Sequence, residues 1–223
     1  MKALVYTDQE TLIFRDEVDA VAQEGETLIK VSAAGICGSD MHAYHGHDDR
    51  RLPPLILGHE ISGINQNNND AVVINPLITC GSCQECKTGR EHLCQSRGLL
   101  GMTKPINRPG GFAEFVAVPN HNIFTIPANA DLNSLSLTEP TAVAYHAIKI
   151  AEQSSFTKIQ QSKILIIGGG AIGLLLALIL QAKDTQDITI IDTNAKRLDV
   201  CKTASNCNIA NPDDSNILNN NYN

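Results

Sequence analysis

The sequence of 223 residues contains no tryptophan, and aromatic residues account for only 4% of it. Hydrophobic residues still make up 43% of the chain, so the core has to be built from alanine, valine, isoleucine and leucine, which is typical of an α/β protein. Positive charge is also scarce, because 17 lysines and arginines face 24 acidic residues and leave a net charge of −7. Nucleic acids are bound through clustered cations, so we expect no nucleic acid as a main partner.

Long hydrophobic runs are missing as well. The longest one, Ile172–Leu180, contains Gly173 and is far shorter than the roughly 20 apolar residues that cross a bilayer. Polar residues follow the first six positions, which leaves no hydrophobic segment of a signal peptide. Disulfides form in oxidising compartments, so the 7 cysteines of a chain without an export signal are expected to be reduced. We therefore expect a cytoplasmic protein with no membrane partner.

Short strand-like runs dominate the first half of the chain, and glycine, proline and asparagine separate them. The runs are Ala3–Tyr6, Thr11–Phe14, Thr27–Ala33, Ala71–Asn75, Gly111–Val118 and Asn122–Ile126. Several short strands at such spacing predict a small β-barrel or sandwich.

The second half has a different pattern, in which helices and buried strands alternate. The elements are a helix over Thr138–Gln153, a strand over Lys163–Ile167, a helix over Ala171–Gln181, a strand over Ile188–Ile191 and a helix over Ala195–Thr203. This order is the beginning of a parallel sheet. The sequence thus predicts an α/β fold with a β-barrel part, divided into residues 1–145 and 146–223.

Four cysteines lie close together within residues 80–94. They are Cys80, Cys83, Cys86 and Cys94, spaced C-x-x-C-x-x-C-x7-C. Four thiolates at this spacing can close a tetrahedral shell around Zn²⁺, and a closed shell has no open position, so this zinc would be structural. Free or disulfide-bonded cysteines are one alternative. A nucleic-acid-binding zinc ribbon is another, and the acidic residues Glu85 and Glu91 weaken it.

Three short motifs flank this lobe, two before it and one after it. They are Gly35-Ile36-Cys37-Gly38-Ser39-Asp40-Met41-His42, Gly58-His59-Glu60 and Thr138-Glu139-Pro140. With Gly110–Phe115 (GGFAEF) and the glycine-rich turn after Ile167, they follow the order found in the zinc-containing medium-chain dehydrogenases, which most of the chain resembles. Glu139-Pro140 and Met41–Tyr44 are similar to the polyol branch, such as sorbitol or galactitol-phosphate dehydrogenases. The resemblance implies a GroES-like catalytic domain in residues 1–145 and the first half of a Rossmann domain in residues 146–223.

The same resemblance implies a second, catalytic zinc ion. Cys37 and His59 are its expected ligands, with Glu139 as the third ligand and Glu60 as a nearby group that exchanges with it; Glu60 as the third ligand is the alternative. A zinc ion with one open position acts as a Lewis acid on a bound alcohol, so an alkoxide forms and transfers a hydride to NAD. Taken singly, each residue also has a structural explanation, such as a buried cysteine or a first-turn helix glutamate.

Two further residues are expected to take part in catalysis. Ser39 lies two residues after Cys37 and would hydrogen-bond the substrate oxygen, although it would serve equally as the N-cap of a short helix. His42 stands where the family places the histidine that relays the proton, a task suited to a side chain that titrates near neutral pH.

The glycine-rich turn has the setting of a dinucleotide site, with a strand before it and a helix after it. Gly168 is expected to form the tight turn, Gly170 to let the backbone approach the pyrophosphate, and Gly173 to pack helix against strand. The free N–H groups at Ala171 and Ile172 would bind the phosphates. Asp192, at the end of the next strand, would accept the ribose hydroxyls and favour NAD over NADP. A glycine-rich turn without a ligand is the alternative.

The chain also departs from the family. The asparagine-rich run at residues 65–69 stands where a hairpin is expected, which predicts a disordered segment and an open sheet edge. The nucleotide-binding sheet reaches only two strands before the asparagine-rich residues 211–223. We therefore expect a C-terminally truncated relative of an oligomeric dehydrogenase, with zinc in the lobe, cofactor binding left open, and little or no turnover of a secondary alcohol. A non-catalytic zinc-binding relative is the alternative.

Overall fold

A computed structural model describes residues 1–127, 129–155, 157–214 and 222. The chain forms two compact units, residues 1–139 and 140–223. The division falls between Glu139 and Pro140 in helix α4 (Thr138–Ser154), the same helix that contains the boundary predicted at residue 145. Among the helices described, none combines the length and hydrophobicity needed to span a membrane.

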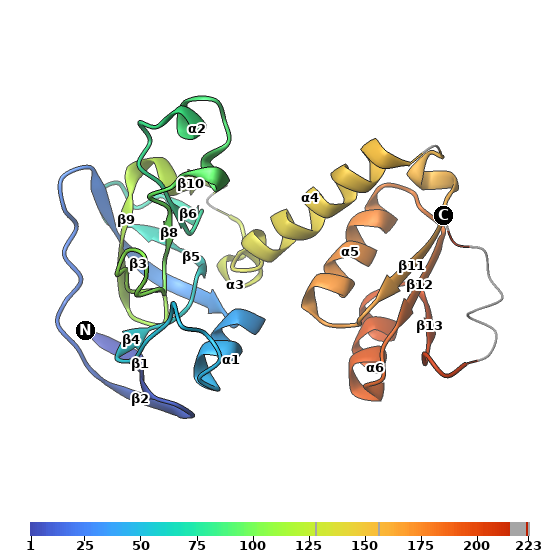
Figure 1. The fold of residues 1–223 in the computed structure, drawn as a ribbon, viewed down its shortest axis with the longest axis horizontal. Helices are drawn as coiled ribbons and strands as arrows, with labels where there is room; N and C mark the ends of the chain where they lie inside the picture. Colours follow the sequence, from blue (N-terminus) through green and yellow to red (C-terminus); the bar gives the residue numbers. More distant parts are fainter. Residues whose placement is uncertain (128, 156, 215–221, 223) are drawn as a thin grey trace. The chain divides into compact units, whose positions relative to one another are not determined.

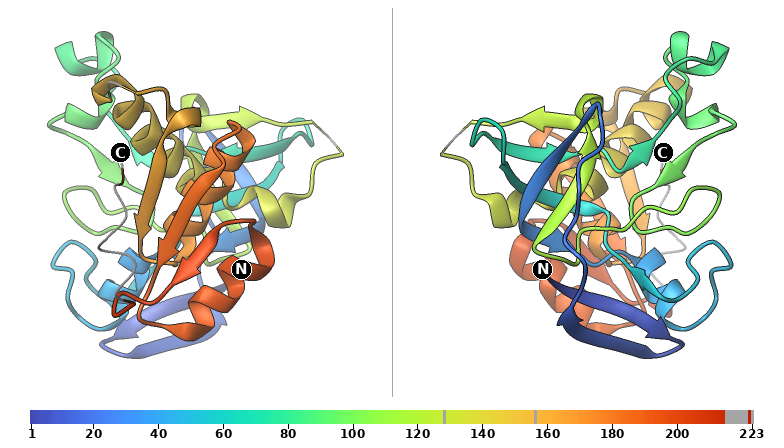
Figure 2. Two further views of the ribbon diagram at one scale, coloured as in Figure 1. Left: turned by 90° about the vertical axis from the view of Figure 1, so that its right-hand side faces the viewer. Right: turned by 90° about the vertical axis from the view of Figure 1, so that its left-hand side faces the viewer.

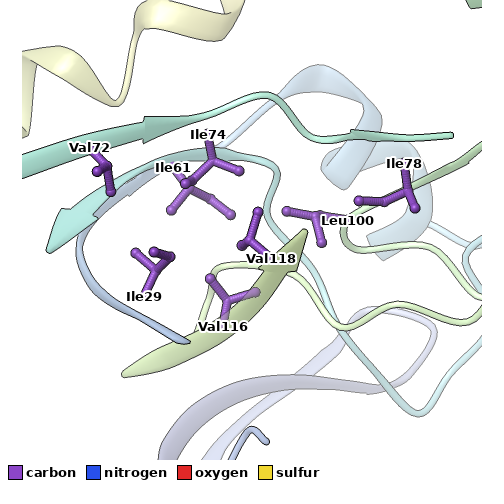
Figure 3. Packing of buried hydrophobic residues seen from close by; sticks show 8 residues of the cluster. All are labelled: Ile29, Ile61, Val72, Ile74, Ile78, Leu100, Val116 and Val118. Carbon is purple, nitrogen blue, oxygen red and sulfur yellow. The ribbon is translucent and has the colours of Figure 1, made fainter. Parts of the chain in front are cut away.

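The centre of the first unit is a five-stranded antiparallel sheet in the order β10-β6-β5-β3-β9 (Figure 1). The strands are β3 (Glu26–Gly35), β5 (Glu60–Asn65), β6 (Ala71–Ile74), β9 (Phe115–Pro119) and β10 (Ile123–Thr125). One face of the sheet carries a core of branched aliphatic side chains, as expected from a sequence poor in aromatic residues. Figure 3 shows this core: Ile29, Ile61, Val72, Ile74, Ile78, Leu100, Val116 and Val118.

Smaller elements complete the first unit. A second sheet, in the order β2-β1-β4, contains β1 (Lys2–Asp8), β2 (Thr11–Asp16) and β4 (Leu55–Ile56). The pair β7 (Leu77–Ile78) and β8 (Gly98–Leu99) brackets the four-cysteine lobe, which contains α2 (Gln84–Lys87) and a 3₁₀ turn over Glu91–Leu93. Helix α1 (Gly38–Tyr44) follows β3, and α3 (Leu132–Leu135) precedes α4.

The asparagine-rich run is the turn of a hairpin, so the predictions of a disordered segment and a missing hairpin are wrong. The run connects β5 to β6, which pair antiparallel, and β10 covers the other edge of β6. Asn65 Oδ1 accepts a hydrogen bond from the Asn67 amide at 2.8 Å, and Asn69 adopts a left-handed φ of 60°. Asparagine side chains satisfy backbone groups in turns and tolerate this conformation, so the segment is ordered without apolar contacts.

The second unit has a parallel sheet in the order β11-β12-β13, and its strands lie side by side in Figure 2. They are β11 (Lys163–Ile167), β12 (Asp187–Ile191) and β13 (Asn208–Ala210), with α5 (Ala171–Ala182) and α6 (Ala195–Ala204) between them. The sequence predicted only two strands, which is wrong, because β13 has three residues in polar surroundings and gives almost no pattern. Residues 215–221 and 223 of the asparagine-rich C-terminal stretch lie outside the described residues.

Candidate active site

The four cysteines of the lobe converge as the sequence predicts. Their sulfur atoms all lie within 4.8 Å of one another, and three separations are 3.4, 3.6 and 3.9 Å. A tetrahedral site with zinc–sulfur bonds of 2.3 Å places its sulfurs about 3.8 Å apart, whereas a disulfide requires about 2.05 Å. The lobe therefore has the dimensions of a zinc site made of thiolates.

The pKa values of two of these thiols are shifted in opposite directions. Hydrogen bonds from the backbone amides of Ser82 and Cys83 lower the pKa of Cys80 to about 6. Burial and the neighbouring thiol of Cys83 raise the pKa of Cys86 to about 11. Gly81 and Gly89 both have a left-handed φ, 66° and 73°, which lets the loop bend around its centre. A bound zinc ion would displace the protons of these thiols, because only the thiolate binds the metal.

A second group of ligand atoms forms where β3 ends and β5 begins. The sulfur of Cys37, a ring nitrogen of His59 and a carboxylate oxygen of Glu60 lie within 4.8 Å of one another. The strand register produces this proximity, because Gly35 is paired with Glu60. A Cβ atom on Gly35 would lie 2.0 Å from Glu60 Oε2, so only glycine leaves room for the carboxylate.

Asp40 holds this group in place. It is 2% exposed, and its carboxylate accepts hydrogen bonds from the Cys37 amide at 3.0 Å and the Gly58 amide at 3.3 Å. Its Oδ1 atom lies 3.6 Å from His59 Nδ1. A carboxylate against the distal nitrogen of a histidine orients the ring toward a metal. The sequence analysis assigned Asp40 no role, although it stands next to Ser39 in the first motif.

Asp40 and Cys37 favour a protonated His59 in the metal-free group. Burial acts to lower the pKa of His59, but interactions with Asp40 and Cys37 outweigh it and raise this pKa to about 10. The interaction with His59 lowers the pKa of Cys37 against the effect of burial. A bound metal would displace the protons of both groups, because it binds the thiolate and the neutral imidazole.

The two glutamates differ in their distance from the group. Glu60 belongs to it, whereas Glu139, at the first turn of α4, lies outside the 4.8 Å group. Burial raises the pKa of both carboxyls; the positive charge of His59 opposes this effect at each, and the charge of Glu139 adds to it at Glu60. The structure therefore brings Glu60 to Cys37 and His59, and leaves Glu139, the ligand preferred from the sequence, within electrostatic range.

Ser39 and His42 lie on α1 in different surroundings. Cys37 is the N-cap of this helix, so Ser39 does not have the capping role considered above. The Ser39 hydroxyl oxygen is buried and lies beside the Cys37 sulfur, whose pKa it helps to lower. His42 is exposed on the last turn, and its ring centre lies 6.4 Å from that of His47.

The glycine-rich turn has the geometry of a phosphate-binding turn. Gly168 has a φ of 102°, and a Cβ atom on Gly173 would lie 1.9 Å from the Gly168 carbonyl oxygen. A Cβ atom on Gly170 would meet nothing within 4 Å, so this side of the turn is open. Ala171 and Ile172 begin α5, where free N–H groups and the helix dipole favour an anion.

Asp192 follows β12 and is hydrogen-bonded to this turn. Its two carboxylate oxygens accept hydrogen bonds from the amides of Gly169 at 2.8 Å and Asn194 at 2.7 Å, which lower its pKa. Arg197 Nη1 lies 3.6 Å away, and the Asp192 residue is 7% exposed. Asp192 Oδ2 therefore interacts with both Gly169 and Arg197, and Oδ1 accepts the hydrogen bond of Asn194.

Known dehydrogenases resemble most of this chain. Residues 23–128 match the model of the alcohol dehydrogenase GroES-like domain. The chain is 31% identical over 207 residues to L-galactonate-5-dehydrogenase of Escherichia coli, a match covering 88% of this chain and 57% of that protein. Galactitol-1-phosphate dehydrogenase of Escherichia coli superposes with a TM-score of 0.81 at 27% identity, covering 94% of this chain and 61% of the other.

A zinc-binding dehydrogenase of Sinorhizobium meliloti, solved with NADP, gives the same TM-score of 0.81 at 28% identity and covers 97% of this chain and 63% of its own. The chain thus spans about three fifths of the length of the relatives it matches. Over that span it has the alcohol dehydrogenase GroES-like domain, followed by parallel β-α units. The relatives of the chain are zinc-type alcohol and polyol dehydrogenases.

Proposed function

We propose that the chain is the zinc- and nucleotide-binding part of an enzyme that oxidises a secondary alcohol of a polyol or sugar alcohol with NAD. The main support is the group of Cys37, His59 and Glu60, whose ligand atoms lie within 4.8 Å of one another. The buried hydroxyl of Ser39 lies beside the Cys37 sulfur. Two relatives are named for oxidation of galactonate and galactitol 1-phosphate, both small polyhydroxylated molecules.

The donor set suits a catalytic zinc ion. One thiolate, one neutral imidazole and one carboxylate balance the charge of Zn²⁺ and leave its fourth position open. Cys37 and His59 supply the first two ligands, and the geometry favours Glu60 over Glu139 as the third. Zinc in such a site supplies Lewis-acid polarisation of an alcohol oxygen. The four-cysteine lobe would hold a second, structural ion.

The protein's own residues orient the reacting alcohol and remove its proton. The buried Ser39 hydroxyl is free to accept the hydrogen bond of a substrate O–H group. His42, exposed at the end of the same helix, is the proposed group that passes the proton to solvent. Asp40 fixes His59 through its Nδ1 atom and thereby positions the metal ligand without touching the substrate.

The nucleotide is assigned to the turn between β11 and α5. The open face at Gly170 and the N–H groups of Ala171 and Ile172 suit a pyrophosphate. The carboxylate charge of Asp192 suits the hydroxyls of an adenosine ribose and repels a 2′-phosphate, which supports NAD over NADP. Equal affinity for ADP-ribose and its 2′-phosphorylated form would contradict this preference.

Metal counting tests the main proposal. The purified full chain, reconstituted and dialysed, should hold two zinc ions, and the Cys37→Ser variant should hold one. Cys207→Ser is a matched control, because Cys207 lies outside both groups of ligand atoms. Polyol-dependent reduction of NAD by the two-zinc form, lost in Cys37→Ser and kept in Cys207→Ser, would support the dehydrogenase activity. A wild-type chain with a single zinc ion would contradict the catalytic site.

A further inference from the structure

A cavity of about 350 Å³ in the first unit has an unusual charge for this acidic protein. Its rim carries three cations, Arg50, Arg97 and Lys104, together with the amide side chain of Gln95, and none of the residues lining it is acidic. The chain as a whole has a net charge of −7, so three cations around one cavity oppose the average charge. None of these residues belongs to either group of metal ligands.

Ion pairing within the protein does not account for this excess. Asp48 forms ion pairs with both Arg50 and Arg51. Arg51 is 2% exposed, so the Asp48 carboxylate balances the charge of this buried arginine. In the part of the chain that the structure describes, neither Arg97 nor Lys104 has an ion pair. At least two positive charges therefore face the cavity without a compensating carboxylate.

The backbone holds the rim in position. The Arg50 carbonyl oxygen accepts hydrogen bonds from the amides of Thr103 at 2.9 Å and Lys104 at 3.1 Å, and from the Thr103 hydroxyl at 2.7 Å. The Arg97 guanidinium donates to the Cys94 carbonyl at 3.4 Å, which connects it to the end of the four-cysteine lobe. A backbone held in this way keeps the three cationic residues beside the cavity when an anion binds.

Apolar side chains, termed the floor, also line the cavity. They are Leu77 of β7, Leu99 of β8 and the buried Met102, so the site combines positive charge with apolar surface. An inorganic anion would use only the rim. A small organic molecule with a phosphate group uses both, because a phosphomonoester carries between −1.5 and −2 charges at pH 7 and strong acceptor oxygens.

We propose that this cavity binds a small phosphorylated organic molecule, with its phosphate on Lys104, Arg97 and Arg50 and its carbon skeleton on the leucine and methionine floor. The site is separate from the proposed zinc and nucleotide sites and does not depend on turnover. Phenyl phosphate is a suitable probe, because it pairs a dianionic phosphate with a flat apolar ring. Phenol tests the floor alone, and inorganic phosphate tests the rim alone.

The experiment is titration of the full, zinc-loaded chain with phenyl phosphate, followed by calorimetry and amide NMR. Binding should be saturable, shift the Gly98 amide at the cavity wall, and weaken at least about tenfold in Lys104→Gln and in Arg97→Gln. Lys30→Gln removes an exposed lysine of β3 outside the cavity and should leave the affinity unchanged. Inorganic phosphate should compete weakly, and phenol should not bind.

Two results would overturn the proposal. One is the absence of saturable binding, and the other is wild-type affinity in Lys104→Gln. Because the turn at Gly170 also attracts phosphates, the titration is repeated in Gly170→Ala. Loss of phenyl phosphate binding there, with retention in Lys104→Gln, would assign the probe to the nucleotide turn and refute the cavity. All substituted cations are exposed, so unchanged thermal unfolding of the variants confirms that folding is not the cause.

Discussion

Two glycines of the turn after β11 are expected to respond in opposite ways to the same added methyl group. A Cβ atom on Gly170 meets nothing within 4 Å, whereas a Cβ atom on Gly173 would lie 1.9 Å from the Gly168 carbonyl oxygen. If the turn binds a pyrophosphate, Gly170 keeps space for the ligand and Gly173 keeps space for the protein itself. Gly170→Ala should therefore impair binding alone, and Gly173→Ala should impair stability and binding.

The magnitudes follow from the contacts. An ordinary non-bonded contact needs about 3.5 Å, so Gly173→Ala forces the helix and turn apart by more than about 1 Å. Overpacking of this kind costs about 1–3 kcal/mol, which lowers the melting temperature of a unit of this size by roughly 4 °C or more. At Gly170 the φ of −78° suits alanine, and the entropy gain and the poorer N-cap oppose each other at similar size. Its stability should stay within about 1 kcal/mol of the wild type.

The assay combines thermal unfolding with calorimetric titration of ADP-ribose, which needs only the turn and the adenosine site. ADP-ribose affinity should fall at least about tenfold in both variants, because the Gly170 methyl group fills the approach of the pyrophosphate. The reasoning is refuted if Gly170→Ala binds ADP-ribose as the wild type does, or if it unfolds as early as Gly173→Ala.

Three further perturbations test the metal sites. Gly35→Ala should displace the Glu60 carboxylate and weaken zinc binding at the catalytic group at least about tenfold. Gly38→Ala should not, because a Cβ atom there meets nothing within 4 Å. Absorption spectra of the cobalt-substituted variants measure this difference. Asp40→Asn should lower the pKa of His59 below about 10 in the metal-free chain. The stability that this raised pKa provides is present below pH 6.5 and is lost as the pH rises through about 10. Denaturation between pH 7 and 10 should therefore show a smaller loss of unfolding free energy in Asp40→Asn than in the wild type. An equal loss contradicts the assignment. Chelation should raise hydrogen exchange in the four-cysteine lobe and leave the main sheet protected, and unchanged exchange in the lobe would exclude a structural zinc ion.

Much of the architecture was predictable because its signals are local. The cysteine spacing, the strand before Gly168 and the helix after it each require a particular backbone, and all are formed. The strand is less buried than expected, because Ile166 alone is buried and Ile167 is 81% exposed. Strand β13 was missed because three residues, Asn208–Ala210, become a strand only by pairing with β12. The turn over residues 65–69 was misread because its order comes from side-chain hydrogen bonds, which hydrophobic content does not report.

Prediction of the site from the sequence was limited in the same way. Cys37 and His59 were found from their motifs, and the structure brings them together. The choice between Glu60 and Glu139 depends on strand register and on the start of α4, which no motif contains. Asp40 acts through buried hydrogen bonds to the backbone, so its role becomes visible only when the loop around Gly58 is folded against it.

The irregularity in β3 has a consequence for how this domain tolerates change. Val31 faces Gly63 and Ala33 faces Ser62, so Ser32 is an extra residue that shifts the phase of the strand before Gly35 meets Glu60. Side chains alternate between the two faces of a sheet, so deletion of this one residue would turn the Glu60 partner position over and separate the metal-binding atoms. The asparagine turn lies at the opposite end of β5, beyond Asn65, and its length is free to vary without altering that phase. Insertions in the asparagine turn therefore leave this phase unchanged, whereas the metal-binding group depends on the number of residues in β3 before Gly35.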